Sequence, residues 1–264
     1  SGYPDSPLLP QARYTIADCH YNMGRYKEAE AGYRRVLELH ADSPKVSDAL
    51  DGLAQTLRML GRDAEAATVK QDWLTTNPKS AAADEVVFAG LRELAAQGDP
   101  ARSIPALQRF ITAHPQSPLL PEAHLLLGRA FRQNDDLDDA EKTLREAIRI
   151  DPAGAFAVES RFELVQTAMA QQDRNKALAL CQELLNDPAA RSSRARTYYK
   201  RGLVYRADRN FAAARQDFEA AQNAQPDNPY ALRAAIEHAI IVAEEGRDRK
   251  STRLHSSHVS QSRL

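Results

Sequence analysis

The five residues SPLLP occur twice in this chain, beginning at Ser6 and again at Ser117, 111 residues later. One third of that distance, 37 residues, is a period that holds along most of the chain without a gap. Proline cannot continue a helix, and it returns at one phase of the period. A period of this length indicates stacked supersecondary repeats, each of which contacts only its neighbours. The prolines of this phase are Pro4, Pro78, Pro115, Pro152 and Pro226.

Other phases of the period predict the structure inside each repeat. A turn phase carries glycine, which suits the left-handed backbone that closes a helix, or a polar residue in its place. Apolar residues recur every three or four positions on both sides of that turn, and alternating β-branched runs are absent. Each repeat is therefore predicted to be a helix, a short turn, a second helix and a proline-containing loop. The turn phase holds Gly24, Gly61, Gly98, Asp135, Gln172, Arg209 and Gly246.

These positions resemble the tetratricopeptide repeat (TPR) family, and the match is strongest from Glu122 to Pro152. The resemblance covers residues 1–247 and implies an all-α fold, a right-handed α-solenoid of stacked helix-turn-helix repeats. It implies six full repeats and the first helix of a seventh, so we expect the solenoid to be truncated at both ends. The signature positions of the best repeat are filled by Leu127, Gly128, Phe131, Ala140, Leu144, Ala147, Ile148 and Pro152.

Each repeat is longer than the usual TPR length of about 34 residues, and we place the extra residues in the loop after the proline. Long-loop repeats of this kind are similar to those of bacterial cell-envelope TPR proteins, of the TolA-binding protein and outer-membrane assembly lipoprotein type. This narrower resemblance implies a location in the periplasm or at the outer membrane rather than in the cytoplasm.

Residues 248–264 do not continue the repeat pattern. The period requires a turn at Gly246 and then a second helix, but the sequence DRKSTRLHSSHVSQSRL has no helical periodicity. The run resembles the conceptual translation of a common sequencing adapter, so we expect these residues to be non-native. A native, disordered basic tail is the alternative. For the same reason His255 and His258 are not interpreted as metal ligands.

Composition and motifs indicate a binding protein rather than an enzyme. The formal net charge is −1, which provides no strong field for nucleic acid, and no apolar run is long enough to span a membrane. The histidines are scattered, and the acidic run at 134–139 falls in a predicted turn, so we expect no catalytic residue, metal or cofactor. Trp73 and Cys181 lie at phases that are mostly apolar in other repeats, and both are predicted core residues.

The remaining candidate site is the concave groove of the solenoid, which the first helix of each repeat lines in the TPR family. One row of first-helix positions is mostly aromatic or apolar, and two neighbouring rows contain arginines. We therefore predict a groove for a protein or peptide partner, with aromatic anchors and with arginines that pair with carboxylates. The alternative is that the aromatic residues pack against the preceding repeat and the arginines only solubilise the surface. The candidate groove residues are Tyr14, Tyr21, Arg58, Phe88, Arg92, Leu125, Arg129, Arg132, Phe162, Met169, Tyr199 and Arg206.

The sequence leaves three functions open. The first is a non-enzymatic protein-binding or peptide-binding scaffold, in a bacterial envelope complex. The second is a regulatory or substrate-recruiting arm of a larger enzyme or sensor whose catalytic domain lies outside this sequence. The third is structural assembly by self-association through exposed end repeats.

Overall fold

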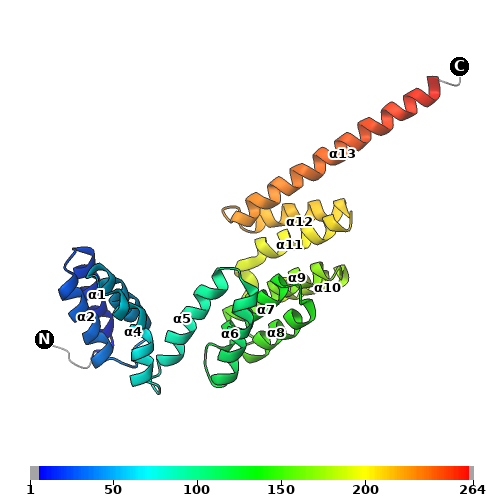
Figure 1. The fold of residues 1–264 in the computed structure, drawn as a ribbon. Helices are drawn as coiled ribbons and strands as arrows, with labels where there is room; N and C mark the ends of the chain where they lie inside the picture. The colour runs from blue at the N-terminus through cyan, green and yellow to red at the C-terminus, as the bar shows by residue number, and fades with distance from the viewer. Residues whose placement is uncertain (1–5, 262–264) are drawn as a thin grey trace. The chain divides into compact units, whose positions relative to one another are not determined.

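The structure is a computed structural model that describes residues 6–261, with side-chain surroundings described as far as Glu245. Every regular element in that range is a helix, which confirms the all-α prediction. The chain forms two compact units, which meet in the sequence between Leu119 and Leu120. The N-terminal unit contains α1 (Leu9–Asn22), α2 (Tyr26–Leu39), α3 (Val46–Met59), α4 (Asp63–Thr76), α5 (Ala83–Ala96) and α6 (Pro100–Ala113) (Figure 1). The C-terminal unit contains α7 (Leu120–Gln133), α8 (Leu137–Ile150), α9 (Ala155–Ala170), α10 (Arg174–Asn186), the 3₁₀ turn η1 (Pro188–Ser193), α11 (Arg194–Ala207), α12 (Phe211–Ala224) and α13 (Pro229–Gln261).

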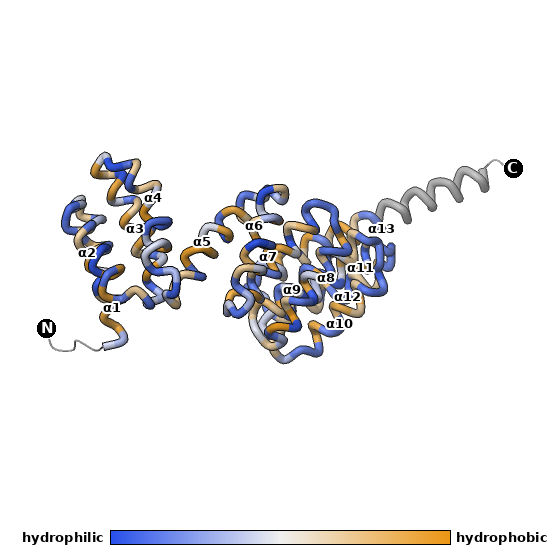
Figure 2. Tube along the Cα trace, turned by 60° about the horizontal axis from the view of Figure 1, so that its bottom comes forward, coloured by the Kyte–Doolittle hydropathy of each residue, from blue (hydrophilic) through white to orange (hydrophobic). Residues whose placement is uncertain are grey.

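Consecutive helices pair as the first and second helices of a repeat, from α1 with α2 to α11 with α12, and α13 follows as a further first helix. Within the C-terminal unit, α8 packs against α9 as well as α7, so a second helix also contacts the next repeat. This packing of neighbour on neighbour is that of a helical repeat solenoid. Hydrophobic and hydrophilic residues are intermixed along the helices in Figure 2, as expected where each helix buries one face. That the repeats form one continuous solenoid stays a prediction.

The turns inside the repeats adopt the backbone that the period predicts. Gly24, Gly61 and Gly98 have φ values of 72°, 75° and 70°. The polar residues at the same phase are also left-handed, with φ values of 65°, 61° and 58° for Asp135, Gln172 and Arg209. Five of these turns, all except that at Gly98, are closed by an amide that donates to a carbonyl five residues earlier, as Arg25 N–H does to the His20 carbonyl oxygen at 2.9 Å.

The expected turn at Gly246 is not formed, because α13 passes through this position and ends at Gln261. A single glycine inside a helix costs only about 1 kcal/mol, and no proline follows Gly246 to stop the helix. The backbone of residues 248–261 is therefore helical. That residues 248–264 are non-native stays a prediction, and their side chains lie outside the described residues.

The core of each unit is made where helices of adjacent repeats approach closely. Alanines of the second helices, such as Ala29, Ala140 and Ala214, are completely buried. Trp73 and Cys181 are 7% and 0% exposed, which confirms both as core residues. Among the helices of residues 6–261, none is both long and apolar enough to cross a membrane.

Candidate functional site

The first helices of the C-terminal unit, α7, α9, α11 and α13, share one group of charges. Lys200 of α11 lies at its centre and is half-buried. Burial and Arg196 lower the pKa of Lys200, Glu163 of α9 opposes this change, and Arg132 of α7 and Arg233 of α13 lower the pKa further. Because ion pairs join α7 to α9, α9 to α11 and α11 to α13, these helices present a common face, which we call the first-helix face. Within the described part of the chain, no carboxylate forms an ion pair with Lys200.

Two predicted groove arginines bind a buried carboxylate within this face. Arg129 Nε donates to Glu163 Oε1 at 2.8 Å, and an Arg132 guanidinium nitrogen lies 3.1 Å from Glu163 Oε2. The Glu163 side chain is only 7% exposed. These contacts join α7 to α9, so the carboxylates that we expected from a partner are supplied by the protein itself.

A second set of contacts joins α9 to α11. An Arg196 guanidinium nitrogen donates to Glu159 at 2.6 Å, and the guanidinium carbon lies 3.8 Å from the centroid of the Phe162 ring. Such a cation–π contact is strongest where water is excluded. The contacts order the Arg196 side chain between α9 and α11, one helical turn from Lys200 on α11.

The third set joins α11 to α13. Arg206 pairs with Glu237 and lies 3.8 Å from Glu244. Tyr199 is half-buried, 5.6 Å from the Tyr230 ring by centroids, and burial raises the pKa of its phenol. Together the three sets show that arginines and carboxylates on adjacent first helices pair with one another.

Three predicted aromatic or apolar anchors are core residues, and their assignment to an accessible groove was wrong. Phe88, Leu125 and Phe162 are 0%, 3% and 0% exposed. Phe88 packs against Phe110 with ring centroids 4.9 Å apart. The position lies where a first helix meets its neighbours, so a large apolar side chain there packs between helices. The alternative interpretation, in which these side chains pack inside the protein, holds for all three, and Phe88 packs on the second helix of its own repeat.

The other candidates retain accessible surface. In the N-terminal unit, Tyr14 and Tyr21 are half-buried, and Arg58 is exposed. Arg92 pairs with Glu85 and lies 4.7 Å from the centroid of the Phe88 ring. In the C-terminal unit Met169 is half-buried and packs against the core. That these residues contact a partner stays a prediction.

Sequence reasoning missed Glu159, Glu163, Arg196 and Lys200, although the period carries a signal for them. Glu159 and Arg196 occupy one phase, 37 residues apart, and so do Glu163 and Lys200; in each case the two charges are opposite. The first two form an ion pair in the structure, and the second two do not. A row of alternating charge on successive first helices predicts ion pairs between repeats. These positions lie outside the aromatic and arginine rows from which the groove is predicted.

No constellation of the described side chains indicates catalysis. In this part of the chain, no three His, Cys, Asp or Glu residues are grouped so that they could hold a metal ion. Burial lowers the pKa of His124 and raises the pKa of the Cys181 thiol to about 12, so Cys181 is a poor nucleophile. His114 Nδ1 lies 2.7 Å from Asp84 and its ring stacks on Phe110, as in a structural histidine.

The repeat geometry agrees with comparisons to known proteins. Three family models, each described as tetratricopeptide repeat, match residues 8–74, 88–155 and 195–228. No curated protein matches the chain. The solved structure of PilW, described as a widely conserved type IV pilus biogenesis factor, is similar with a TM-score of 0.55 and 18% identity, over 86% of this chain and 98% of PilW.

Two further solved structures are similar in fold. Pseudomonas aeruginosa PilF has a TM-score of 0.50 and 14% identity, over 86% of this chain and 97% of PilF. A monomeric mutant of IFIT1 with m7Gppp-AAAA has a TM-score of 0.62 and 13% identity, over 94% of this chain and 58% of IFIT1. Identities this low show the fold alone. With three matching family models, which together cover more than half of its residues, the chain belongs to the tetratricopeptide repeat family.

Proposed function

We propose that this chain is a non-catalytic scaffold whose first-helix face in the C-terminal unit binds an acidic segment of a partner protein. The TPR repeats support a protein-interaction scaffold. The observation that carries the finer proposal is that half-buried Lys200 forms no ion pair with a described carboxylate, on a face where Arg129 and Arg196 are already paired. A carboxylate from a partner would pair with the positive charge of Lys200, which no described carboxylate pairs with.

The ion pairs around Lys200 support this site in a second way. Arg129 and Arg132 are held by Glu163, and Arg196 is held by Glu159, so their side chains are fixed before a partner arrives. A positive site that is already ordered loses less conformational entropy on binding than a flexible one. Charge complementarity of this kind chiefly determines which partners are accepted and how fast they bind.

The test uses a short labelled peptide of alternating glutamate and leucine, and a second peptide with glutamine in place of glutamate. Fluorescence anisotropy is expected to show saturable binding of the glutamate peptide, which weakens as salt is added. Lys200→Met keeps the aliphatic stem and removes the charge, and it is expected to weaken binding at least about fivefold. The matched control is Lys142→Met, which removes an exposed lysine on the second helix α8.

Two results would contradict the proposal. Equal affinity for the glutamate and glutamine peptides would show that charge does not select the partner. Equal loss of affinity in the Lys200 and Lys142 variants would show that binding depends on overall charge and not on the first-helix face.

A bacterial envelope complex is the setting that we propose for this scaffold. Its support is the long-loop repeat and the description of PilW, a structural neighbour, as a pilus biogenesis factor. The regulatory or substrate-recruiting arm of a larger enzyme remains the second candidate. Fractionation of cells that express the complete reading frame separates the two: recovery with the envelope supports the first, and a catalytic domain in the same polypeptide supports the second.

A further inference from the structure

The N-terminal unit contains a cavity that the first-helix face does not include. Its volume is about 410 Å³, and it is bounded by α2, α3 and α4. This volume lies within the usual range of ligand pockets, about 300–1,000 Å³. Helices α2 and α4 are second helices of their repeats, so the cavity opens between elements that a concave groove does not use.

The floor of the cavity is apolar. Leu50 and Leu53 of α3 are 0% and 1% exposed, and Val69 of α4 is 9% exposed. Leu37 of α2 lies on the opposite wall and is 9% exposed. A surface of this kind favours a large apolar group of a ligand, because water molecules in contact with it find no hydrogen-bond partners there.

Trp73 adds one unpaired hydrogen-bond donor to this floor. Its side chain is 7% exposed, and the indole Nε1–H is buried with no acceptor among the described residues. Buried tryptophan N–H groups normally find a partner. This atom has almost no accessible surface, so a ligand carbonyl oxygen in the cavity would satisfy the donor only once the indole ring turns toward it.

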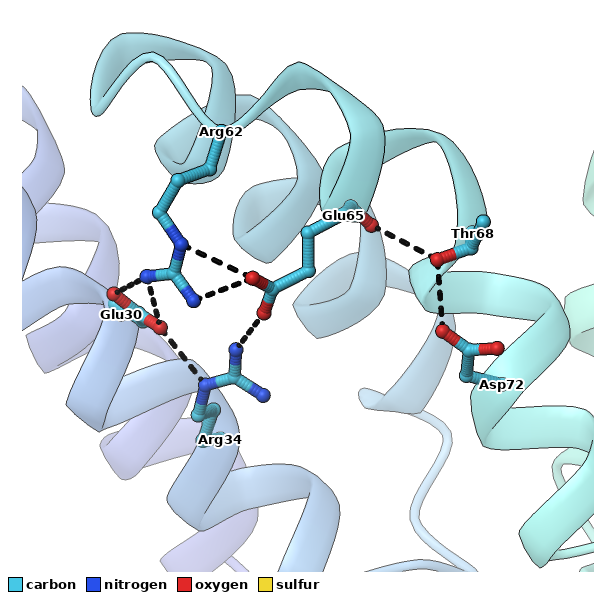
Figure 3. A network of polar contacts seen from close by, with 6 residues as sticks. All are labelled: Glu30, Arg34, Arg62, Glu65, Thr68 and Asp72. Carbon is cyan, nitrogen blue, oxygen red and sulfur yellow. Dashed lines mark hydrogen bonds and ion pairs between the residues drawn. The ribbon is translucent and has the colours of Figure 1, made fainter.

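The rim of the cavity carries excess negative charge. Arg34 lines the cavity, and Figure 3 shows that Arg34 and Arg62 both bind Glu30 and Glu65. The Arg34–Glu65 contact is 2.5 Å and the Arg62–Glu30 contact is 2.8 Å. Among the described residues that line the cavity, no basic side chain remains to pair with a further carboxylate.

Two rim carboxylates have no cationic partner among the described residues. Asp72 accepts a hydrogen bond from the Thr68 hydroxyl at 2.8 Å, as drawn in Figure 3, and Glu38 is exposed on α2. Both line the cavity. A ligand that combines an apolar group with a positive charge would therefore match the floor and the rim together.

We propose that this cavity binds a short peptide segment of a partner protein in which a large apolar side chain is flanked by lysine or arginine. The apolar side chain fills the floor between Leu53 and Val69. A backbone carbonyl of the segment accepts the hydrogen bond from Trp73 Nε1–H, and the flanking cation pairs with Glu38 or Asp72. The required charge is opposite to that expected at Lys200, so the chain carries two peptide sites of opposite preference.

The test uses the intrinsic fluorescence of Trp73, which is the chain's single tryptophan and lies in the cavity wall. The probes are the blocked tripeptide acetyl-Lys-Phe-Lys-amide and two relatives, acetyl-Glu-Phe-Glu-amide and acetyl-Lys-Ser-Lys-amide. Only the first is expected to change the emission saturably, with an affinity at least about tenfold above either relative. Equal responses to all three probes would overturn the proposal.

Substitutions test the contributions of the rim carboxylates and of Trp73 separately. Glu38→Gln and Asp72→Asn together are expected to weaken acetyl-Lys-Phe-Lys-amide about fivefold, whereas Glu28→Gln, an exposed acid elsewhere on α2, is expected to leave its affinity unchanged. Trp73→Phe keeps an aromatic ring and removes the donor. Because the smaller ring leaves space in the core, its unfolding midpoint is expected to fall, and calorimetry at a temperature where both proteins are folded is expected to show weaker binding. Binding of acetyl-Phe-amide as tight as that of the tripeptide would show a cavity for small apolar molecules and would overturn the peptide assignment.

Discussion

Glu163 is the residue whose removal most clearly tests the contacts between first helices. Its carboxylate accepts hydrogen bonds from Arg129 at 2.8 Å, from Arg132 at 3.1 Å and from the Gln166 amide at 3.2 Å. Glu163→Gln keeps the shape of the side chain and one acceptor oxygen, and it removes the negative charge. Two arginines and the nearby Lys200 would then lie together with less charge to balance them.

The expected loss is about 2 kcal/mol of unfolding free energy. A hydrogen bond to a charged group contributes about 1.5–3 kcal/mol, and at least two weaken in Glu163→Gln. The arginine side chains are 35% and 27% exposed, so water recovers part of this loss. For a chain of this size about 2 kcal/mol corresponds to a fall in melting temperature of about 6 °C.

Urea unfolding followed by far-ultraviolet circular dichroism measures the change, and hydrogen exchange locates it at α7 and α9. The matched control is Glu146→Gln on α8, whose partner Arg149 is 72% exposed, and its expected cost is below about 0.5 kcal/mol. Equal effects of the two substitutions would refute the argument, because they would show that the buried carboxylate contributes no more than a surface one.

Three further predictions concern the turns, the packing of one glycine and the burial of Cys181. Gln172 has a left-handed backbone that strains a non-glycine residue, so Gln172→Gly is expected to raise the unfolding free energy by about 1 kcal/mol. Gly61→Ala at the same phase is expected to lower it. Urea unfolding measures both changes. Gly202→Ala places a Cβ 2.5 Å from the Phe218 ring and is expected to cost about 1–3 kcal/mol, whereas Gly90→Ala meets no atom within 4 Å and should not destabilise the helix. Burial raises the pKa of the Cys181 thiol to about 12. A thiol reagent at neutral pH is therefore expected to modify the exposed Cys19 at once and Cys181 only on unfolding. Fast modification of both cysteines would contradict the burial of Cys181.

The helices and their turns could be predicted from the sequence because each depends on local chemistry that recurs. Proline ends a repeat, a left-handed residue closes its first helix, and both return with the period. The period remains informative where glycine is replaced, as at Asp135 and Arg209, since the turn is closed by backbone hydrogen bonds. At Gly246 the same rule failed, because one glycine without a following proline is too weak a signal to end a helix.

The site was harder to predict because exposure depends on how repeats pack. Phe88 and Phe162 share a phase with Tyr14 and Tyr199, yet the first two are completely buried and the others are half-buried. Spacing along one helix does not distinguish these cases, since the neighbouring repeat decides how much of each ring is covered. The arginines were recognised, but their partners Glu159 and Glu163 lie on the next first helix, and pairing across repeats requires coordinates.

The most direct test of the scaffold account is the pKa of Lys200, followed by carbon-13 NMR of its ε-carbon and assigned by the signal that Lys200→Met lacks. In the free protein, burial and three arginines hold this pKa below the usual value of a lysine, so the ammonium loses its proton at a lower pH than exposed lysines do. A carboxylate bound beside Lys200 stabilises the charged form, and the glutamate peptide is therefore expected to raise the pKa. A pKa that stays unchanged at saturating peptide would contradict binding at the first-helix face.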